Sequence, residues 1–73
     1  MENTKKLTLE ELRKVKGVTQ QQLAGRIGTN QPAISKIEKA RSCSLRTLKK
    51  YINGLGGKLE IKAVFDGDVI ELQ

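Results

Sequence analysis

Apolar residues recur every three or four positions through most of the chain, which is the spacing that places them on one face of an α-helix. The first stretch of this kind covers residues 7–16, where Thr8 can cap a helix and where Leu9, Leu12 and Val15 would share one face. Three further helices are predicted over residues 20–27, 31–39 and 45–54. The polar residues that can cap their first turns are Thr19, Asn30 and Ser44.

The end of the chain changes from a helical period to an alternating one. Residues 58–65 and 68–72 alternate as strands do, and the Asp66-Gly67 pair between them is a strong signal for a two-residue hairpin turn. A register that matches apolar with apolar residues, and Lys with Glu, pairs Ile61 with Leu72, Lys62 with Glu71 and Ala63 with Ile70.

These patterns predict a mainly α protein of four or five short helices followed by a C-terminal β-hairpin. We expect residues 1–55 to form a helical domain and residues 56–73 to form the hairpin. A core for the helical part would include the aliphatic positions of the fourth helix, which are Leu45, Leu48, Ile52 and Leu55. Because a 73-residue chain can build only a small core, pairing with a second copy would add stability.

Residues 20–39, QQQLAGRIGTNQPAISKIEK, have the pattern of a helix-turn-helix that recognises DNA. Ala24 is small where the two helices would touch, and Gly28 allows a positive φ in the short turn. Any two amphipathic helices can share the spacing of the large aliphatic residues. The joint placement of Ala24, Gly28 and those aliphatic residues favours the helix-turn-helix, and it leaves a polar, basic face on the second helix.

The charge balance points to the same kind of partner. The chain carries 14 Lys and Arg residues against 8 acidic residues, for a net charge of +6. Such a balance suits nucleic acid, although a merely solvated basic surface is the alternative. Glu38 is the one acid between residues 36 and 50, a stretch that contains Lys36, Lys39, Arg41, Arg46, Lys49 and Lys50.

Several classes of function lack the residues that they would need. The chain has no histidine and one cysteine, so we expect no disulfide within the chain, no metal site built from Cys and His, no cofactor and no catalytic activity. Cys43 would pack as a small apolar residue or, alternatively, would be a reactive thiol. No apolar run has the length of a membrane span and the first residues do not resemble a signal peptide, which predicts a cytoplasmic protein without membrane contact.

Residues 12–40, LRKVKGVTQQQLAGRIGTNQPAISKIEKA, resemble the XRE family of helix-turn-helix proteins, the group of the Cro-like and lambda-repressor-like regulators. The tail, residues 51–72, resembles a subgroup of HigA/HipB-type antitoxins, in which a glycine-rich link leads to a C-terminal hairpin that builds the dimer. Two departures stand out: Ala40 replaces the glycine that often follows the recognition helix, and Gly25 lies inside a helix. Gly25 would be either a close approach to DNA or, as we favour, an unimportant surface residue.

The resemblance implies roles for individual residues. Gln31 would contact a base edge, while Gln20 would touch a phosphate and brace Gln31. Arg13 and Glu38 would form an ion pair that ties the first helix to the third. The remaining residues expected at the DNA, as further base or phosphate contacts, are Asn30, Pro32, Ser35, Lys36, Lys39, Arg41 and Ser42. Since Pro32 occupies a position that contacts bases in some relatives, fewer bases would be recognised there.

The hairpin predicts the assembly. An isolated two-stranded hairpin is marginal in water, so a second copy would cover its apolar side, formed by Leu59, Ile61, Ala63, Phe65, Ile70 and Leu72. The alternative is that the hairpin folds back on its own helices. The resulting hypothesis is a homodimeric repressor that binds an inverted repeat in double-stranded DNA.

Two other functions remain open at this point. The resemblance of the tail suggests a type II antitoxin that binds a RelE/HigB-like toxin and regulates its own operon. The strongly basic charge is a poor match for a basic toxin, and the sequence has no long acidic arm to wrap one. A controller from a phage or a restriction system is the third possibility, and it would have no toxin gene beside it.

Overall fold

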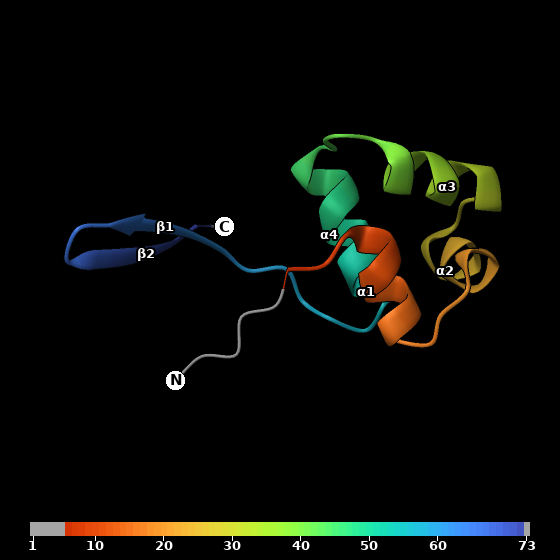
Figure 1. Ribbon diagram of the computed structural model, residues 1–73, viewed down its shortest axis with the longest axis horizontal. Coiled ribbons are helices and arrows are strands. Elements are labelled where there is room, and N and C mark those ends of the chain that lie inside the picture. Colours follow the sequence, from red (N-terminus) through yellow and green to blue (C-terminus); the bar gives the residue numbers. More distant parts are fainter. Residues whose placement is uncertain (1–5, 73) are drawn as a thin grey trace.

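The computed structural model describes residues 6–72 as four helices followed by one antiparallel hairpin (Figure 1). The helices are α1 (Leu9–Val15), α2 (Gln20–Ile27), α3 (Gln31–Lys39) and α4 (Leu45–Gly54). The strands are β1 (Ile61–Phe65) and β2 (Asp68–Leu72). This arrangement confirms the predicted fold class.

Each helix begins at its predicted cap. The hydroxyls of Thr8 and Thr19 accept hydrogen bonds from the backbone of the third helical residue, whose side chain in turn accepts from the cap, so both form capping boxes. Asn30 and Ser44 accept in the same way at α3 and α4. The expected first helix, residues 7–16, was too long at both ends, because Thr8 and Lys16 are the capping residues and the helix lies between them.

Backbone geometry explains where α2 and α3 end. Gly28 follows α2 with a φ of +77°, the left-handed conformation that the turn before α3 requires and that a residue with a side chain adopts at a cost. α3 ends at Lys39 as expected, although Ala40 stands where relatives often carry glycine. Ala40 is extended, with φ −71° and ψ 146°, so no left-handed residue is needed there.

The core lies where α2 packs against α3 and α4. Leu23, Ile34 and Tyr51 are fully buried, and Ala24 and Val18 complete the buried cluster. α4 approaches α2 closely at Gly54. A Cβ atom added at Gly54 would lie 2.6 Å from Cδ1 of Leu23 and 2.7 Å from Cγ2 of Ile27, which is closer than packed atoms come.

Three predicted core positions were wrong. Val15 is 68% exposed, because it lies about 120° around the helix axis from Leu9, and Arg13 takes the buried position on α1 instead. Leu45, at the first turn of α4, is 61% exposed and faces the hairpin side of the molecule. Cys43 is exposed in the loop before α4 rather than packed beneath it, as is usual for surface connections.

The hairpin has the predicted register. Ile61 pairs with Leu72, Lys62 with Glu71 and Ala63 with Ile70. β1 is shorter than expected at its start, because residues 58–60 have no partners in the described part of β2, which ends at Leu72. Gly67 adopts a φ of +86° in the turn, which fits the tight connection.

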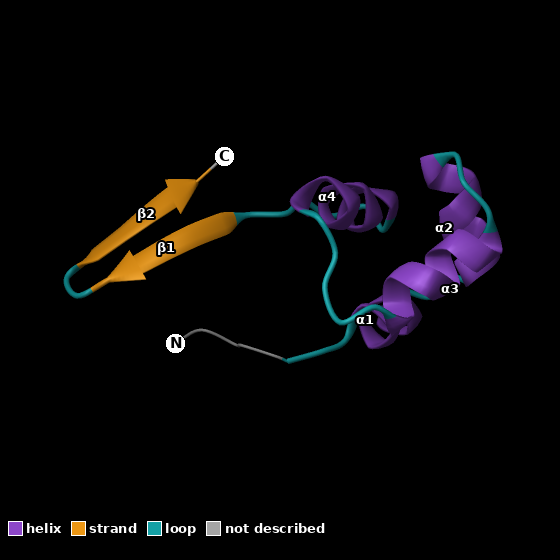
Figure 2. Ribbon diagram, turned by 90° about the horizontal axis from the view of Figure 1, so that it is seen from above, coloured by secondary structure: helices purple, strands orange, loops and turns teal. Residues whose placement is uncertain are grey.

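The hairpin extends away from the helices, as Figures 1 and 2 show from two directions. The molecule is accordingly elongated, with extents of 43 × 24 × 22 Å. The alternative in which the hairpin folds back on its own helices is therefore not what the structure shows. Large apolar side chains of the hairpin remain between 49% and 75% exposed, namely Val64, Phe65, Val69, Ile70 and Leu72.

A groove of about 650 Å³ separates the start of α4 from the base of the hairpin. The apolar residues that line it are Leu45, Leu59, Ile61 and Leu72. Over residues 6–72, none of the helices combines the length and apolar character that crossing a membrane would require. The same residues contain no group of three or more His, Cys, Asp or Glu side chains that could hold a metal ion.

Candidate nucleic-acid interface

The outer side of α3 carries most of the predicted DNA contacts. Gln31, Lys36 and Lys39 are exposed and Ser35 is half-buried, while Ile34 is fully buried on the opposite side. Pro32 is exposed in the first turn of α3. Proline is tolerated there because backbone N–H groups in the first turn have no partner within the helix. α3 thus presents polar and basic side chains to solvent. Figure 1 shows the helix running along one side of the helical body, with its first turn at the end away from the hairpin.

Residues on either side of α3 extend this surface. Asn30 is exposed, and its Oδ1 accepts a hydrogen bond of 3.0 Å from the backbone N–H of Ala33, which leaves its side-chain NH₂ group available. Arg41 and Ser42 are exposed in the loop at the other end of α3, so the structure separates them from Gln31 by the length of the helix.

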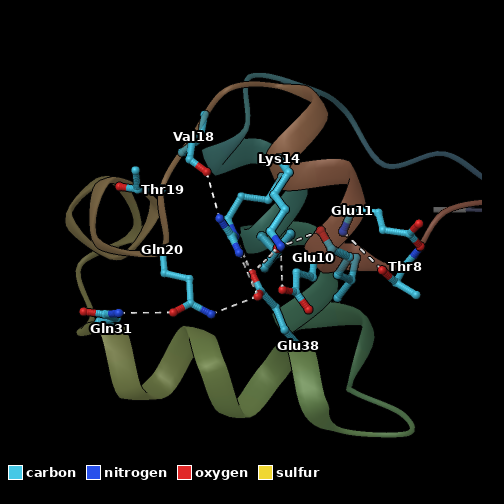
Figure 3. A network of polar contacts seen from close by, with 12 residues as sticks. Thr8, Glu10, Glu11, Lys14, Val18, Thr19, Gln20, Gln31 and Glu38 are labelled. Atoms are coloured by element: carbon cyan, nitrogen blue, oxygen red, sulfur yellow. Dashed lines mark hydrogen bonds and ion pairs between the residues drawn. The ribbon is translucent and has the colours of Figure 1, made fainter.

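Gln31 does not stand alone at the tip of α3. Its Nε2 donates to Oε1 of Gln20, at 3.2 Å, and Nε2 of Gln20 donates to Oε1 of Glu38, at 3.0 Å. Figure 3 shows the three side chains in a row from the start of α2 and α3 towards the interior. The predicted bracing of Gln31 by Gln20 is therefore present as a direct contact.

Arg13 binds Glu38, the inner member of this row. Nε and Nη2 of Arg13 donate to the two carboxylate oxygens of Glu38 at 2.6 and 3.1 Å, and Nη1 donates to the Val18 carbonyl oxygen at 3.0 Å. The two side chains are only 7% and 3% exposed. A two-pronged bond of this kind fixes the direction of both groups as well as their distance, and it joins α1 to α3.

Tyr51 is the residue that sequence reasoning missed. Its hydroxyl donates to Oε2 of Glu38 at 2.6 Å and lies 3.0 Å from the carbonyl oxygen of Leu9, so α4 is joined to the same carboxylate. The available signal was its position between Leu48 and Ile52 on the apolar side of the predicted fourth helix. A buried tyrosine there needs a partner for its hydroxyl.

The surroundings keep Glu38 ionised. Burial by itself would raise its pKa, but the hydrogen bonds from Arg13, Tyr51 and Gln20 outweigh burial and lower the pKa from 4.5 to about 2. The bond to Glu38 raises the pKa of Arg13 in return, and burial together with Glu38 raises the pKa of Tyr51. Around neutral pH the cluster is therefore an ion pair with a neutral phenol.

The arrangement combines positive charge, which attracts a polyanion, with an exposed amide, which can form hydrogen bonds to specific groups. A shallow groove of about 570 Å³ runs beside the tip of α3 and is lined by residues that include Lys14, Gln20 and Gln31. The N-terminus of α3 adds partial positive charge near Gln31. Lys36 and Lys39 supply full charges further along the helix. Phosphates would meet cations here, and the amide of Gln31 would meet hydrogen-bonding groups.

Comparison with known proteins gives the class that this geometry indicates. The chain belongs to the helix-turn-helix family, whose model matches residues 9–62. A Mycobacterium tuberculosis (strain ATCC 25618 / H37Rv) protein named "Putative antitoxin HigA2" is 40% identical over 55 residues, which are 73% of this chain and 54% of that protein. The chain therefore spans about half the length of this curated relative.

Two solved structures resemble almost the whole chain. One, described as "DNA bound antitoxin HigA3", has a TM-score of 0.88 at 34% identity and covers 96% of this chain and 94% of its own. The other, described as "Induced DNA bending by unique dimerization of HigA antitoxin", has a TM-score of 0.87 at 34% identity and covers 97% of both chains. The expected resemblance to XRE-type regulators and HigA antitoxins is confirmed, while the individual DNA contacts stay predictions.

Proposed function

We propose that the protein binds double-stranded DNA as a homodimer and represses transcription by occupying an operator. The observation that carries this proposal is the exposed, basic side of α3, with Gln31 held at its tip by Gln20. A single helix of this kind fits the width of the major groove of B-DNA. The solved HigA relatives whose descriptions name bound DNA or DNA bending support the proposal.

Gln31 is the proposed base contact. Its amide can accept from N6 and donate to N7 of adenine, the two-bond pairing by which glutamine recognises that base. Ser35 and Lys36 lie along the exposed part of α3 and would make further base or phosphate contacts. The residues proposed to hold the sugar-phosphate backbone, and thereby the register, are Gln20, Asn30, Lys39, Arg41 and Ser42.

The hairpin is the proposed dimerisation unit, formed by residues 56–73, with residues 1–55 as the DNA-binding unit. Phe65, Ile70 and Leu72 are exposed in one copy, and a second hairpin of the same kind is the simplest cover for them. The residues proposed for this interface are Leu59, Ile61, Ala63, Phe65, Ile70 and Leu72. A two-fold dimer would place its α3 helices about 34–36 Å apart, so the operator would be an inverted repeat.

A second role, as an antitoxin, is favoured by the similarity to HigA proteins over nearly the full length of two solved chains. In that role the protein would bind a RelE/HigB-like toxin directly and regulate its own operon through the DNA site. Both proposed roles are binding functions, without catalysis or a cofactor, and both would be carried out in the cytoplasm. A toxin gene next to this one would separate the second role from a plain repressor.

Selection of duplex DNA by the purified protein tests the first proposal. Random duplexes retained by the protein should share an inverted repeat, and their binding should weaken steeply as salt is added, because cations on the protein replace counterions on the phosphates. Retention of unrelated sequences with equal affinity at every salt concentration would contradict the proposal. For the second role, co-purification with the product of an adjacent toxin-like gene is the expected result.

A further inference from the structure

Hydrogen bonds connect the centre of the core to the tip of α3 without interruption. Tyr51, which is fully buried, donates to Glu38 at 2.6 Å. Glu38 accepts from Gln20 at 3.0 Å, and Gln20 accepts from Gln31 at 3.2 Å. These residues come from α4, α3 and α2, so the exposed amide of Gln31 is linked to the packing of three helices. Figure 3 shows the part of the series formed by Gln31, Gln20 and Glu38.

The direction of each bond follows from the charge on Glu38. An ionised carboxylate can only accept hydrogen bonds, so Gln20 must turn its NH₂ group towards Glu38. The carbonyl oxygen of Gln20 then faces the other way and can only accept, which requires the NH₂ group of Gln31. The amide of Gln31 is left with its carbonyl oxygen and its second N–H free.

This polarity has a consequence for base recognition. Adenine presents one donor, at N6, and one acceptor, at N7, in the major groove, whereas guanine presents acceptors at both O6 and N7. A free carbonyl oxygen beside a free N–H matches adenine and opposes its oxygen to the O6 of guanine. A Gln31 amide that could turn over freely would discriminate less between the two purines.

Resting on the proposed DNA binding, we propose that Tyr51 is a positioning residue for base recognition, which acts through Glu38 and Gln20 to fix the orientation of the Gln31 amide. The two carboxylate oxygens of Glu38 accept hydrogen bonds from different groups. Oε2 is occupied by the Tyr51 hydroxyl and by Nε of Arg13, which leaves Oε1 for Gln20 and for Nη2 of Arg13. Without the hydroxyl, Oε2 keeps only Nε of Arg13, so the carboxylate is held less rigidly and the acceptor that orients Gln20 is less well fixed.

The test compares Tyr51→Phe with Ile52→Val in the full chain. Tyr51→Phe keeps the buried ring and removes only the hydroxyl, whereas Ile52→Val trims the neighbouring, half-buried residue of α4 without touching a polar group. The Gln31→Ala variant first identifies the base position of a selected operator at which it no longer discriminates between bases. Affinities are then measured for that operator with adenine and with guanine at this position. We expect Tyr51→Phe to lower the adenine-to-guanine ratio about fivefold and Ile52→Val to leave it unchanged.

The ratio distinguishes positioning from a merely structural role. A loss of folded protein weakens binding to both operators alike and does not move their ratio. An unchanged ratio in a folded Tyr51→Phe variant would overturn the inference and leave the proposed function intact. The inference would also be overturned if the unmodified protein preferred guanine to adenine at the position where Gln31→Ala loses its discrimination.

A second variant decides the matter if Tyr51→Phe fails to fold. Gln20→Ala breaks the same series of bonds near the surface, and it leaves the ion pair and Tyr51 in place. The inference requires a lower adenine-to-guanine ratio for this variant too, and an unchanged ratio would overturn it. If the unmodified protein preferred no duplex sequence at all, the proposed function itself would fail, and that result is recognisable before any variant is made.

Discussion

The helical body and the hairpin differ in how far their side chains are buried and hydrogen-bonded within one copy of the chain. In the body, Leu23, Ile34 and Tyr51 are fully buried. Across the described residues, no buried polar side-chain atom lacks a hydrogen-bond partner. In the hairpin every residue is at least partly exposed, and Val64 reaches 75%. The body therefore has a buried core within one copy, whereas the hairpin leaves most of its large apolar side chains exposed.

The two regions also differ in what their residues would specify, which is base recognition for the body and self-association for the hairpin. The body fixes side chains at the tip of α3 through directional bonds, of which the Arg13–Glu38 pair is the centre. The hairpin offers matched cross-strand pairs with apolar residues on both faces, such as Ala63–Ile70 on one and Val64–Val69 on the other. Changes in the body should alter folding and base recognition, and changes in the hairpin should alter assembly.

The largest expected effect comes from breaking the ion pair. Glu38→Ala leaves the buried guanidinium of Arg13 without its partner, which should lower the free energy of unfolding by about 3–5 kcal/mol. Glu10→Ala is the control, because the Glu10–Lys14 pair is mostly exposed and should contribute about 0.5 kcal/mol or less. Urea unfolding at one fixed protein concentration measures both, and similar losses would contradict a special role for the buried pair.

Acid should destabilise the helical body by protonating Glu38 and so weakening the same ion pair. The pKa of Glu38 is lowered in the folded state to about 2, so below pH 4.5 the unfolded chain binds a proton that the folded chain does not. Stability is therefore present above about pH 4.5 and is lost as the pH falls towards 2, by about 3 kcal/mol in total. Unfolding of Glu38→Gln should lack this part of the pH dependence, and an identical profile for both proteins would refute the assignment.

A change in the hairpin should leave the body folded. Ile70→Lys places a charge among the predicted interface residues and should weaken self-association by about 2 kcal/mol or more, since it removes a large aliphatic side chain from the interface. Sedimentation measures the dimer, and circular dichroism measures the helices, which should be unchanged. Glu71→Gln, in the adjacent and exposed position, changes the net charge by the same single unit and is the matched control. A dimer that survives Ile70→Lys would place the interface elsewhere.

The smallest effects come from two glycines in the body and have opposite signs. Gly54→Ala forces a Cβ against Leu23 and Ile27 and should destabilise the fold by about 1–3 kcal/mol. Gly25 has open space around it within α2, so Gly25→Ala should stabilise by up to about 1 kcal/mol. Thermal unfolding of the two variants under one buffer gives the comparison. A destabilised Gly25→Ala would show that the position is not a simple helix surface.

Local features could be predicted from the sequence because they depend on neighbouring residues. The caps at Thr8, Thr19, Asn30 and Ser44 require only a side-chain oxygen three residues before a free N–H. The hairpin register follows from pairing apolar residues around a two-residue turn, and the structure has that register. The basic, exposed side of α3 likewise follows from helical spacing.

Packing choices could not be obtained in this way. Arg13, rather than Val15, is the buried residue of α1, because α3 brings Glu38 to it from 25 positions further along the chain. The bond from Tyr51 to Glu38 joins residues 13 positions apart on separate helices. The Arg13–Glu38 pair was suggested by family resemblance alone. The apolar side of α4 indicates a buried Tyr51 whose hydroxyl needs a partner, but it does not identify Glu38 as that partner.

α3 is proposed to recognise bases through Gln31 and to hold phosphates through its cations. The decisive measurement is the affinity of Gln31→Ala and of Lys39→Ala for a selected operator and for random duplex DNA. We expect Gln31→Ala to weaken binding to the operator but not to random DNA, and Lys39→Ala to weaken both by the same factor. Equal losses on both DNAs for Gln31→Ala would contradict the proposed base recognition.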